Sequence, residues 1–314
     1  MNIKNCLNIM LLIFMLSIFN GCVKLDNLKE NIFYSVYSQK KSDNFNKDKQ
    51  ILDLYEANFS ENKILSLSSK EFSRENAKIG LWLPYKFIKN TGGGLYFLDE
   101  YDSEKTVVLF VHGAAGTPLD WKNIIKNLDK DKFQPLVVSY PTGINLKHTV
   151  KIINTNIRKL VSRYGINKII VVAHSMGGIV SKALIKELNQ KDKIVNLFIT
   201  ISTPWNGHNG ASNTERLPYY IPSWNDMKKN SDFIQNIKDN SILENVEYYL
   251  FFGYQGKMTL YGRDNDGTIS LESQLAEYAQ SSAKRIIGFN ENHTSILFSN
   301  KVSLKINIIL KDKL

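Results

Sequence analysis

Short runs of apolar residues alternate along the chain with longer segments whose apolar residues recur at helical spacing. The runs are rich in Val, Ile and Phe, which is typical of strands buried on both faces of a parallel sheet. Strands are predicted at residues 95–98, 106–111, 135–140, 168–173, 194–202, 247–253 and 284–289. Helices are predicted at residues 117–128, 145–164, 176–188, 270–282 and 294–311. This alternation predicts an α/β fold, with a mostly parallel sheet flanked by helices.

Two regions break the alternation. Residues 22–90 are largely polar, and we expect them to form a tether and a small accessory segment before the main domain at residues 91–314. Residues 205–245 follow a predicted core strand and are too long for a simple loop. They carry several aromatic residues, including Trp205 and Trp224, which a plain surface excursion would leave in water. This insertion is therefore predicted to form a cap over a pocket.

The N-terminus has the layout of a secretory signal peptide. In residues 1–21, a short basic stretch precedes an apolar run at residues 7–19, and Cys22 follows a small residue. This arrangement resembles the lipobox of bacterial lipoproteins, which implies that Cys22 carries lipid and becomes the mature N-terminus. A transmembrane anchor is the alternative, but the uncharged run at residues 6–23 is short for spanning a bilayer. We expect an exported lipoprotein that is anchored in the membrane of the bacterial cell envelope.

Composition narrows the possible partners and cofactors. The chain has 314 residues, 43% of them hydrophobic, which suffices for one large α/β core and an accessory segment. Its net charge of +10 comes from lysines scattered along the chain, without an arginine-rich stripe, so nucleic acid is not an expected partner. The glycine turn at residues 91–94 lacks the lysine and the helix of a phosphate loop, and no metal-ligand cluster is visible. We expect no cofactor and no metal.

The most informative stretch is the turn between the strand at residues 168–173 and the helix after it. Ser175 stands at its apex, and the residues two before and two after it, Ala173 and Gly177, are small. These are the requirements of a nucleophile elbow, in which a strained turn exposes the serine hydroxyl above the sheet. A second glycine, Gly178, allows the helix to approach the strand closely. The alternative is an ordinary loop whose serine caps the helix.

A nucleophilic serine needs a base and an acid that orients the base. In the α/β-hydrolases, whose nucleophile elbow this turn resembles, the acid and then the histidine follow the serine along the chain. Of the five histidines, only His293 follows both Ser175 and a plausible acid. The acid is expected in the loop after the strand at residues 247–253, where Asp266 precedes a glycine and the start of a helix. Asp264 in the same loop is the competing candidate, and Asp-Gly also marks ordinary turns.

Two backbone N–H groups should form an oxyanion hole. One is expected from Met176, which follows the nucleophile at a helix N-terminus. The other is expected from Ala114 in the glycine-containing loop at residues 112–117, the oxyanion loop. His112 is interpreted as a structural hydrogen-bonding residue, and His174 as a residue packed beside the elbow. The remaining histidines are interpreted as surface or cap residues: His148 and His208.

Four short motifs occur in order along the chain: F-V-H-G-A-A-G-T-P at residues 110–118, A-H-S-M-G-G at 173–178, S-T-P-W-N-G at 202–207 and D-G-T at 266–268. Together they resemble the lipase/esterase branch of the α/β-hydrolases, over residues 95–314. The resemblance implies an α/β-hydrolase domain and serine-dependent cleavage of carboxylic esters through an acyl-enzyme.

Carried onto this chain, the resemblance implies roles for five residues: Ser175 as nucleophile, Asp266 as acid, His293 as base, and Ala114 and Met176 as oxyanion donors. The expected partners are an ester or lipid substrate and the membrane, in which the lipid on Cys22 is anchored. The same triad would also serve an acyltransferase, and a surface lipoprotein with a non-catalytic binding role is a further alternative. A protease or amidase is chemically possible, but no peptide-binding feature is present in the sequence.

Overall fold

The structure of the protein is a computed structural model, which describes residues 44–190, 193–208, 221–256 and 264–313. The predicted signal peptide and Cys22 lie outside the described residues, as does part of the predicted cap, residues 209–220. The candidate nucleophile, acid, base and oxyanion donors all lie within the described ranges.

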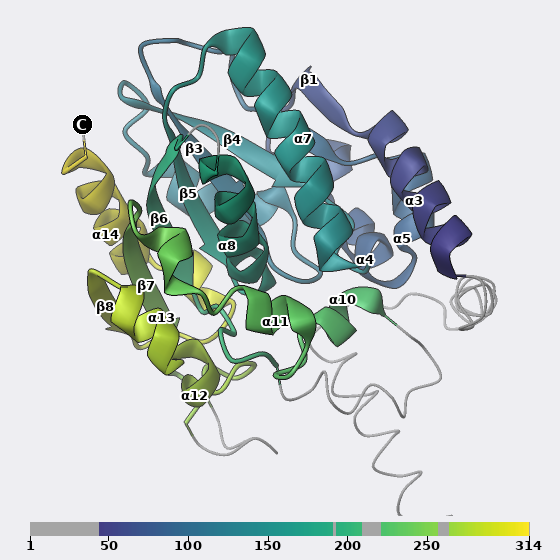
Figure 1. Cartoon of the computed structure of the whole chain (residues 1–314). Helices are drawn as coiled ribbons and strands as arrows, with labels where there is room; N and C mark the ends of the chain where they lie inside the picture. The colour runs from purple at the N-terminus through teal and green to yellow at the C-terminus, as the bar shows by residue number, and fades with distance from the viewer. Residues whose placement is uncertain (1–43, 191–192, 209–220, 257–263, 314) are drawn as a thin grey trace, which may run out of the picture.

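One sheet of eight strands forms the centre of the molecule (Figure 1). The strands lie in the order β1-β2-β4-β3-β5-β6-β7-β8, and every neighbouring pair is parallel except β2 and β4, which run antiparallel. Their bounds are β1 (Ser60–Ile64), β2 (Gly94–Phe97), β3 (Thr106–Val111), β4 (Phe133–Ser139), β5 (Ile169–His174), β6 (Val195–Ile201), β7 (Glu247–Gly253) and β8 (Arg285–Phe289). The mostly parallel sheet that the sequence predicts is confirmed.

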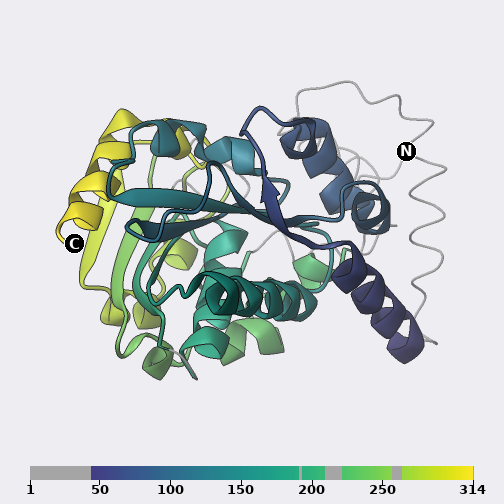
Figure 2. The same cartoon turned by 90° about the horizontal axis from the view of Figure 1, so that it is seen from above.

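Helices cover both faces of the sheet, which Figure 2 shows nearly edge-on. Helices α7 and α8 pack on one face, and α6 and α14 pack on the other. The helix bounds are α3 (Asn44–Asn58), α4 (Arg74–Trp82), α5 (Pro84–Asn90), α6 (Lys122–Lys126), α7 (Leu146–Tyr164), α8 (Met176–Asn189), α10 (Pro222–Asp226), α11 (Asp232–Asn236), α12 (Leu271–Gln274), α13 (Glu277–Ser282) and α14 (Asn300–Lys311). Short 3₁₀ turns are η1 (Lys70–Phe72), η2 (Pro118–Trp121), η4 (Asn240–Leu243) and η5 (Ser295–Leu297).

The central strands are apolar throughout because each of their faces meets a helical layer. In β3, Leu109 and Val111 join the core under α7 and α8, whereas Val108 and Phe110 join the core under α6 and α14. All four side chains are fully buried. A strand with one solvated face would alternate apolar and polar residues, so the unbroken apolar run already indicated two covered faces.

Three helices that the sequence predicts as continuous are interrupted. Residues 117–128 form η2 and then α6, residues 294–311 form η5 and then α14, and residues 270–282 form α12 and α13. Between α12 and α13 the chain becomes extended at Ala276, with φ −55° and ψ 136°. The buried side chain of Gln274, at the end of α12, is bonded to the backbone of Gly253. This tertiary bond fixes α12 against β7. The spacing of apolar residues along the chain cannot predict such a bond, so it predicted one continuous helix.

The segment before residue 91 shares the core of the main domain. Strand β1 extends the sheet beside β2, and Tyr55 and Phe59 pack in the core under α7. Phe72 is buried on the opposite face of the sheet, where its ring meets that of Tyr96 edge-on at 5.3 Å between centroids. The accessory segment therefore contributes to both hydrophobic layers.

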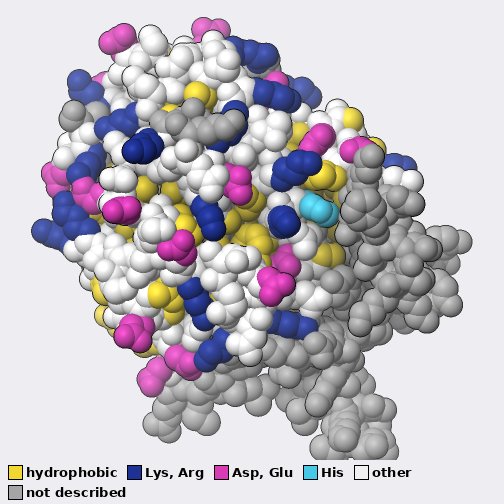
Figure 3. Space-filling model, viewed as in Figure 1, with side chains coloured by type: hydrophobic (Ala, Val, Ile, Leu, Met, Phe, Trp, Pro, Cys, Tyr) yellow, Lys and Arg dark blue, Asp and Glu magenta, His cyan; other side chains and the backbone are white. Residues whose placement is uncertain are grey.

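The surface carries charges of both signs. On the face drawn in Figure 3, lysine and arginine side chains lie interspersed with aspartate and glutamate. Among the described residues, no helix has the length and apolar character needed to cross a membrane.

Asp226, at the end of α10, caps the N-terminus of α7. Its Oδ2 accepts a hydrogen bond from the Leu146 N–H at 2.7 Å. The first N–H groups of a helix have no acceptor within the helix, and this carboxylate provides one of them with an acceptor. Burial raises the pKa of Asp226 to about 6, although the Leu146 N–H bond acts in the opposite direction. This carboxylate joins the described part of the predicted cap to the main domain.

Substituting Asp226→Asn should stabilise the fold more at pH 7.5 than at pH 4. A raised pKa means that the folded state holds the proton more tightly than the unfolded chain, so the parent loses stability as the pH rises from about 4 to 6. Asparagine does not titrate, and the difference in unfolding free energy should grow over this interval by about 3 kcal/mol at most. Urea unfolding of both proteins at the two pH values measures it. An exposed carboxylate on the neighbouring α11, Asp232, provides the control Asp232→Asn; a gain for Asp226→Asn that does not change with pH would contradict the prediction.

Candidate active site

Ser175 occupies a strained turn between β5 and α8. Its φ of 54° and ψ of −129° lie in a region that residues other than glycine rarely adopt. The Ser175 N–H donates to the carbonyl oxygen of Ile201 in the adjacent strand at 2.9 Å, which fixes the turn to the sheet. A strained serine at the carboxyl edge of a parallel sheet has the geometry of a nucleophile elbow.

The glycines after Ser175 are required by close backbone approaches. A Cβ on Gly177 would lie 2.3 Å from the carbonyl oxygen of Val111 in β3, and one on Gly178 would lie 2.0 Å from Oγ1 of Thr203. Neither distance is compatible with a side chain. Because of these two glycines, α8 begins directly above the sheet with the Ser175 hydroxyl at its N-terminus.

The structure brings Ser175, His293 and Asp266 into one hydrogen-bonded chain. His293 Nε2 lies 3.0 Å from Ser175 Oγ, and His293 Nδ1 lies 2.7 Å from Asp266 Oδ2. His293 follows β8, and Asp266 lies in the loop after β7, so all three side chains come from the carboxyl edge of the sheet. With the Nδ1 proton directed at the carboxylate, Nε2 is free to accept the serine proton.

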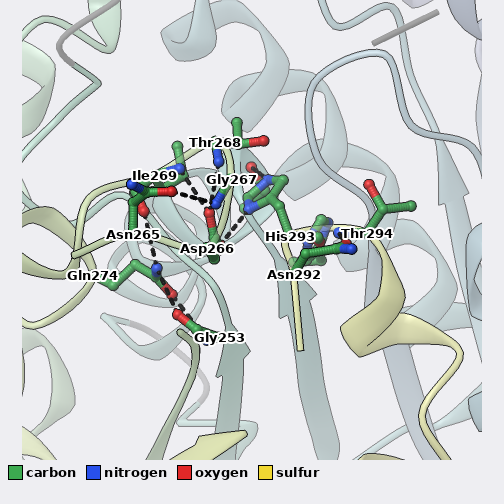
Figure 4. Close-up of polar contacts among 12 residues, drawn as sticks. Gly253, Asn265, Asp266, Gly267, Thr268, Ile269, Gln274, Asn292, His293 and Thr294 are labelled. Atoms are coloured by element: carbon green, nitrogen blue, oxygen red, sulfur yellow. Dashed lines mark hydrogen bonds and ion pairs between the residues drawn. The ribbon is translucent and has the colours of Figure 1, made fainter. Parts of the chain in front are cut away.

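Asp266 is buried and held by backbone donors (Figure 4). Its Oδ1 accepts hydrogen bonds from the N–H groups of Thr268 at 3.0 Å and Ile269 at 2.7 Å, and its own carbonyl accepts the His293 N–H at 2.8 Å. Burial acts to raise the pKa of Asp266, but His293 and the two backbone donors outweigh it, and the net effect lowers the pKa. Asp266 is therefore a carboxylate at neutral pH. The competing candidate, Asp264, is exposed to solvent.

The turn that carries Asp266, residues 265–269 (the acid turn), is itself fixed at both ends. Asn265 Oδ1 accepts the Gly267 N–H at 2.6 Å, and Gly267 has a φ of 94° that favours glycine. Gln274 donates to the carbonyls of Ile269 and Gly253, each at 3.2 Å (Figure 4). The acid is thus tied to the end of β7, and its distance to His293 does not depend on a free loop.

One of the two expected oxyanion donors directly follows the nucleophile, and the other lies in the loop that packs against it. Met176 is the first residue of α8, where the first N–H groups have no intrahelical partner. Gly113 packs against the serine, because a Cβ on this residue would lie 2.7 Å from the Cβ of Ser175. Ala114 follows at an exposed position. Within the described part of the chain, the N–H groups of Ala114 and Met176 have no hydrogen-bond partner.

Three further histidines surround the site, and none is suited to serve as the base. His112 stacks on Tyr140 with ring centroids 4.3 Å apart, and His174 Nε2 hydrogen-bonds the carbonyl oxygen of His293 at 2.9 Å. Burial lowers the pKa of His112 to about 4 and that of His174 to about 3. Groups with such low pKa values are weak bases near neutral pH. His112 also lies 3.0 Å from the carbonyl oxygen of Gly113 through its Nδ1, and the ring of His174 lies beside that of His293, with centroids 4.7 Å apart.

His208 also belongs to this surrounding layer, which no sequence pattern indicated. It is half-buried and hydrogen-bonds the backbone of Thr268 in the acid turn. Burial and the nearby His293 lower the pKa of His208 to about 4.

In the described residues, no group of three or more His, Cys, Asp or Glu side chains is placed to hold a metal ion.

Comparisons with known proteins agree with this architecture. A family model described as the PGAP1-like alpha/beta domain matches residues 136–250, which include Ser175 but neither Asp266 nor His293. No curated protein sequence matches the chain.

Among solved structures, the lipase BlEst2 of Bacillus licheniformis in its mature form is similar with a TM-score of 0.53 and 19% identity, over 69% of this chain and 96% of that chain. The product of gene lin2722 from Listeria innocua is similar with a TM-score of 0.50 and 16% identity, over 66% of this chain and 94% of that chain. At this level of identity the similarity concerns the fold, and the fold is that of the α/β-hydrolases.

Proposed function

We propose that this α/β-hydrolase-fold protein is a serine hydrolase that cleaves carboxylic esters through an acyl-enzyme. The observation that carries the proposal is the continuous chain of hydrogen bonds from Asp266 through His293 to the hydroxyl of the strained Ser175. A serine alcohol is a poor nucleophile at neutral pH unless a base accepts its proton during the attack. The resemblance to lipases and esterases supports the choice of an ester as substrate.

In the first half of the reaction, Ser175 Oγ attacks the ester carbonyl carbon while its proton passes to His293 Nε2. The carbonyl oxygen becomes an oxyanion, to which the N–H groups of Ala114 and Met176 donate hydrogen bonds. The intermediate collapses as the C–O bond to the alcohol breaks, and His293 gives the proton to the departing alkoxide. Asp266 stabilises the imidazolium that exists between these proton transfers.

In the second half, water replaces the alcohol. His293 takes a proton from the water, whose oxygen attacks the acyl carbon, and the same two N–H groups stabilise the second oxyanion. Collapse of this intermediate breaks the bond to Ser175 Oγ, which recovers its proton from His293. The products are a carboxylic acid and the free enzyme, and no redox step or cofactor is needed.

From the aromatic residues of the predicted cap we infer that the substrate carries an apolar acyl group. Trp224 of α10 meets Trp82 of α4 edge-on, with ring centroids 5.6 Å apart, and both side chains remain half-buried. Aromatic rings of this kind offer large apolar contact area to a ligand.

A chain-length series of p-nitrophenyl esters tests the proposal. We expect saturable hydrolysis with an optimum in acyl length, and covalent labelling by a fluorophosphonate that mass spectrometry locates on the peptide containing Ser175. An esterase should prefer short acyl chains and a lipase long ones. Failure of a folded protein both to hydrolyse any ester and to react with the fluorophosphonate would refute the proposal. Transfer of the acyl group to an added alcohol in preference to water would identify an acyltransferase with the same triad.

A further inference from the structure

Helix α4 contacts the surroundings of the oxyanion loop near both of its ends. The helix belongs to residues 22–90, which the family resemblance does not include and for which the sequence indicated no function. Arg74 stands at its first position, and Gly80 lies in its last turn. Each end reaches the oxyanion loop through a different chain of polar contacts.

The N-terminal end of α4 reaches the loop through Asp120. Arg74 forms an ion pair with this carboxylate, whose Oδ2 accepts the N–H of Thr117 at 2.9 Å. A Cβ on Gly116 would lie 3.0 Å from the same oxygen, so the carboxylate is packed directly against the loop. The Thr117 hydroxyl in turn donates to the carbonyl oxygen of Phe72 at 2.7 Å, just before α4.

The C-terminal end of α4 reaches the loop through Thr142. The Thr142 hydroxyl accepts the N–H of Ala115 at 3.0 Å. The next residue, Gly143, donates its N–H to the carbonyl oxygen of Gly80 at 2.9 Å. A Cβ on Gly143 would lie 2.1 Å from the carbonyl oxygen of Leu81, so the loop after β4 is in close backbone contact with α4.

Three N–H groups of the oxyanion loop that follow Ala114 are already bonded, two of them to the residues that link the loop to α4. The N–H of Ala115 is bonded to Thr142, that of Gly116 to the Gly113 carbonyl at 3.0 Å, and that of Thr117 to Asp120. Ala115 also has a positive φ of 51°, which alanine adopts only at a cost. The backbone around Ala114 is therefore held in an unfavourable conformation by its neighbours, which leaves the Ala114 N–H directed to no acceptor in the described structure.

We propose that α4 braces the oxyanion loop, and that Arg74 and Asp120 are positioning residues for the Ala114 donor. The proposal rests on the proposed function, because the brace is argued to hold the N–H group that stabilises the oxyanion. Donors stabilise a developing charge most when they are fixed before the substrate arrives, since no energy is then spent on reorganising them. The segment before residue 91 thereby acts on the chemical step and contributes more than packing.

Arg74→Ala tests the brace with p-nitrophenyl butyrate as substrate. Since the Arg74 side chain is 51% exposed, its loss should leave the fold intact, which thermal unfolding checks. We expect kcat to fall about tenfold, less than the 10²- to 10³-fold loss typical of removing an oxyanion donor, with KM nearly unchanged. Arg74→Lys, which keeps the charge without the planar fork, should recover part of kcat.

The control is Lys159→Ala. Lys159 pairs with Glu61 at 3.1 Å and so ties the same N-terminal segment to α7, away from the oxyanion loop. Its loss should leave kcat within twofold of the parent. Equal losses of kcat in Arg74→Ala and Lys159→Ala would mean that only general packing of the segment matters, and would overturn the proposal.

Amide hydrogen exchange tests the brace independently of catalysis. Arg74→Ala should accelerate exchange at Ala115 and Thr117, whereas Lys159→Ala should not. Unchanged exchange and unchanged kcat in Arg74→Ala, beside an inactive Ser175→Ala, would refute the brace and leave the proposed function standing. If the parent hydrolyses no ester but its loop exchanges faster in Arg74→Ala, the brace exists and the proposed function fails.

Discussion

Replacing Ser175 with alanine is expected to lower the turnover number for p-nitrophenyl esters by about 10⁴-fold or more. The hydroxyl oxygen is the atom that would form the bond to the acyl group. Without it, Ala114, Met176 and His293 can assist no other nucleophile as effectively from their positions. Substrate binding should persist, because the methyl group fits wherever the hydroxymethyl group does. Steady-state kinetics of the variant, together with loss of fluorophosphonate labelling, measure the effect.

A matched control lies in α8, the helix that follows Ser175. Ser181 in α8 is also fully buried, and its hydroxyl has no hydrogen-bond partner in the described structure. Ser181→Ala should keep turnover within a few fold of the parent, since it removes a buried serine hydroxyl without touching His293. A Ser175→Ala variant that retains near-normal turnover would sink the proposed mechanism, whatever the result for the control.

Substituting Asp266→Asn is expected to lower turnover by about 10³- to 10⁴-fold with little change in KM. The carboxylate accepts the Nδ1 proton of His293 at 2.7 Å, whereas an asparagine amide can offer an N–H to that nitrogen and so favours the opposite tautomer. In that tautomer Nε2 carries the proton and cannot accept another from Ser175. Steady-state kinetics at neutral pH measure the loss.

Asp264→Asn is the paired control for this prediction. Asp264 stands two residues away on the same loop but is exposed to solvent. Its carbonyl oxygen accepts the Leu271 N–H, a bond that asparagine retains, so turnover should stay within twofold of the parent. Comparable losses in both variants would mean that the loop as a whole matters and that Asp266 has no special role. Unchanged turnover in Asp266→Asn would remove it from the proposed triad.

The sequence by itself determined the central sheet and the elbow. Both depend on local chemistry: unbroken runs of β-branched residues require burial on two faces, and a serine between small residues after such a run allows a strained turn. Gly177 and Gly178 could be identified for the same reason, because the steric demand of a strand–turn–helix junction repeats wherever that junction occurs. Chain order then left His293 as the candidate base.

Only the tertiary structure decided how distant parts of the site meet. His293 lies 118 residues from Ser175, and the choice between Asp266 and Asp264 depends on which side chain the turn after β7 directs inward. Strand β1 is short, polar and at the edge of the sheet, so no apolar run marks it. The contact of the Phe72 carbonyl with Thr117 spans 45 residues and uses a backbone oxygen. A pattern along the chain records which side chains prefer burial, but a contact between distant backbone and polar groups exists only once the sheet order has placed them together.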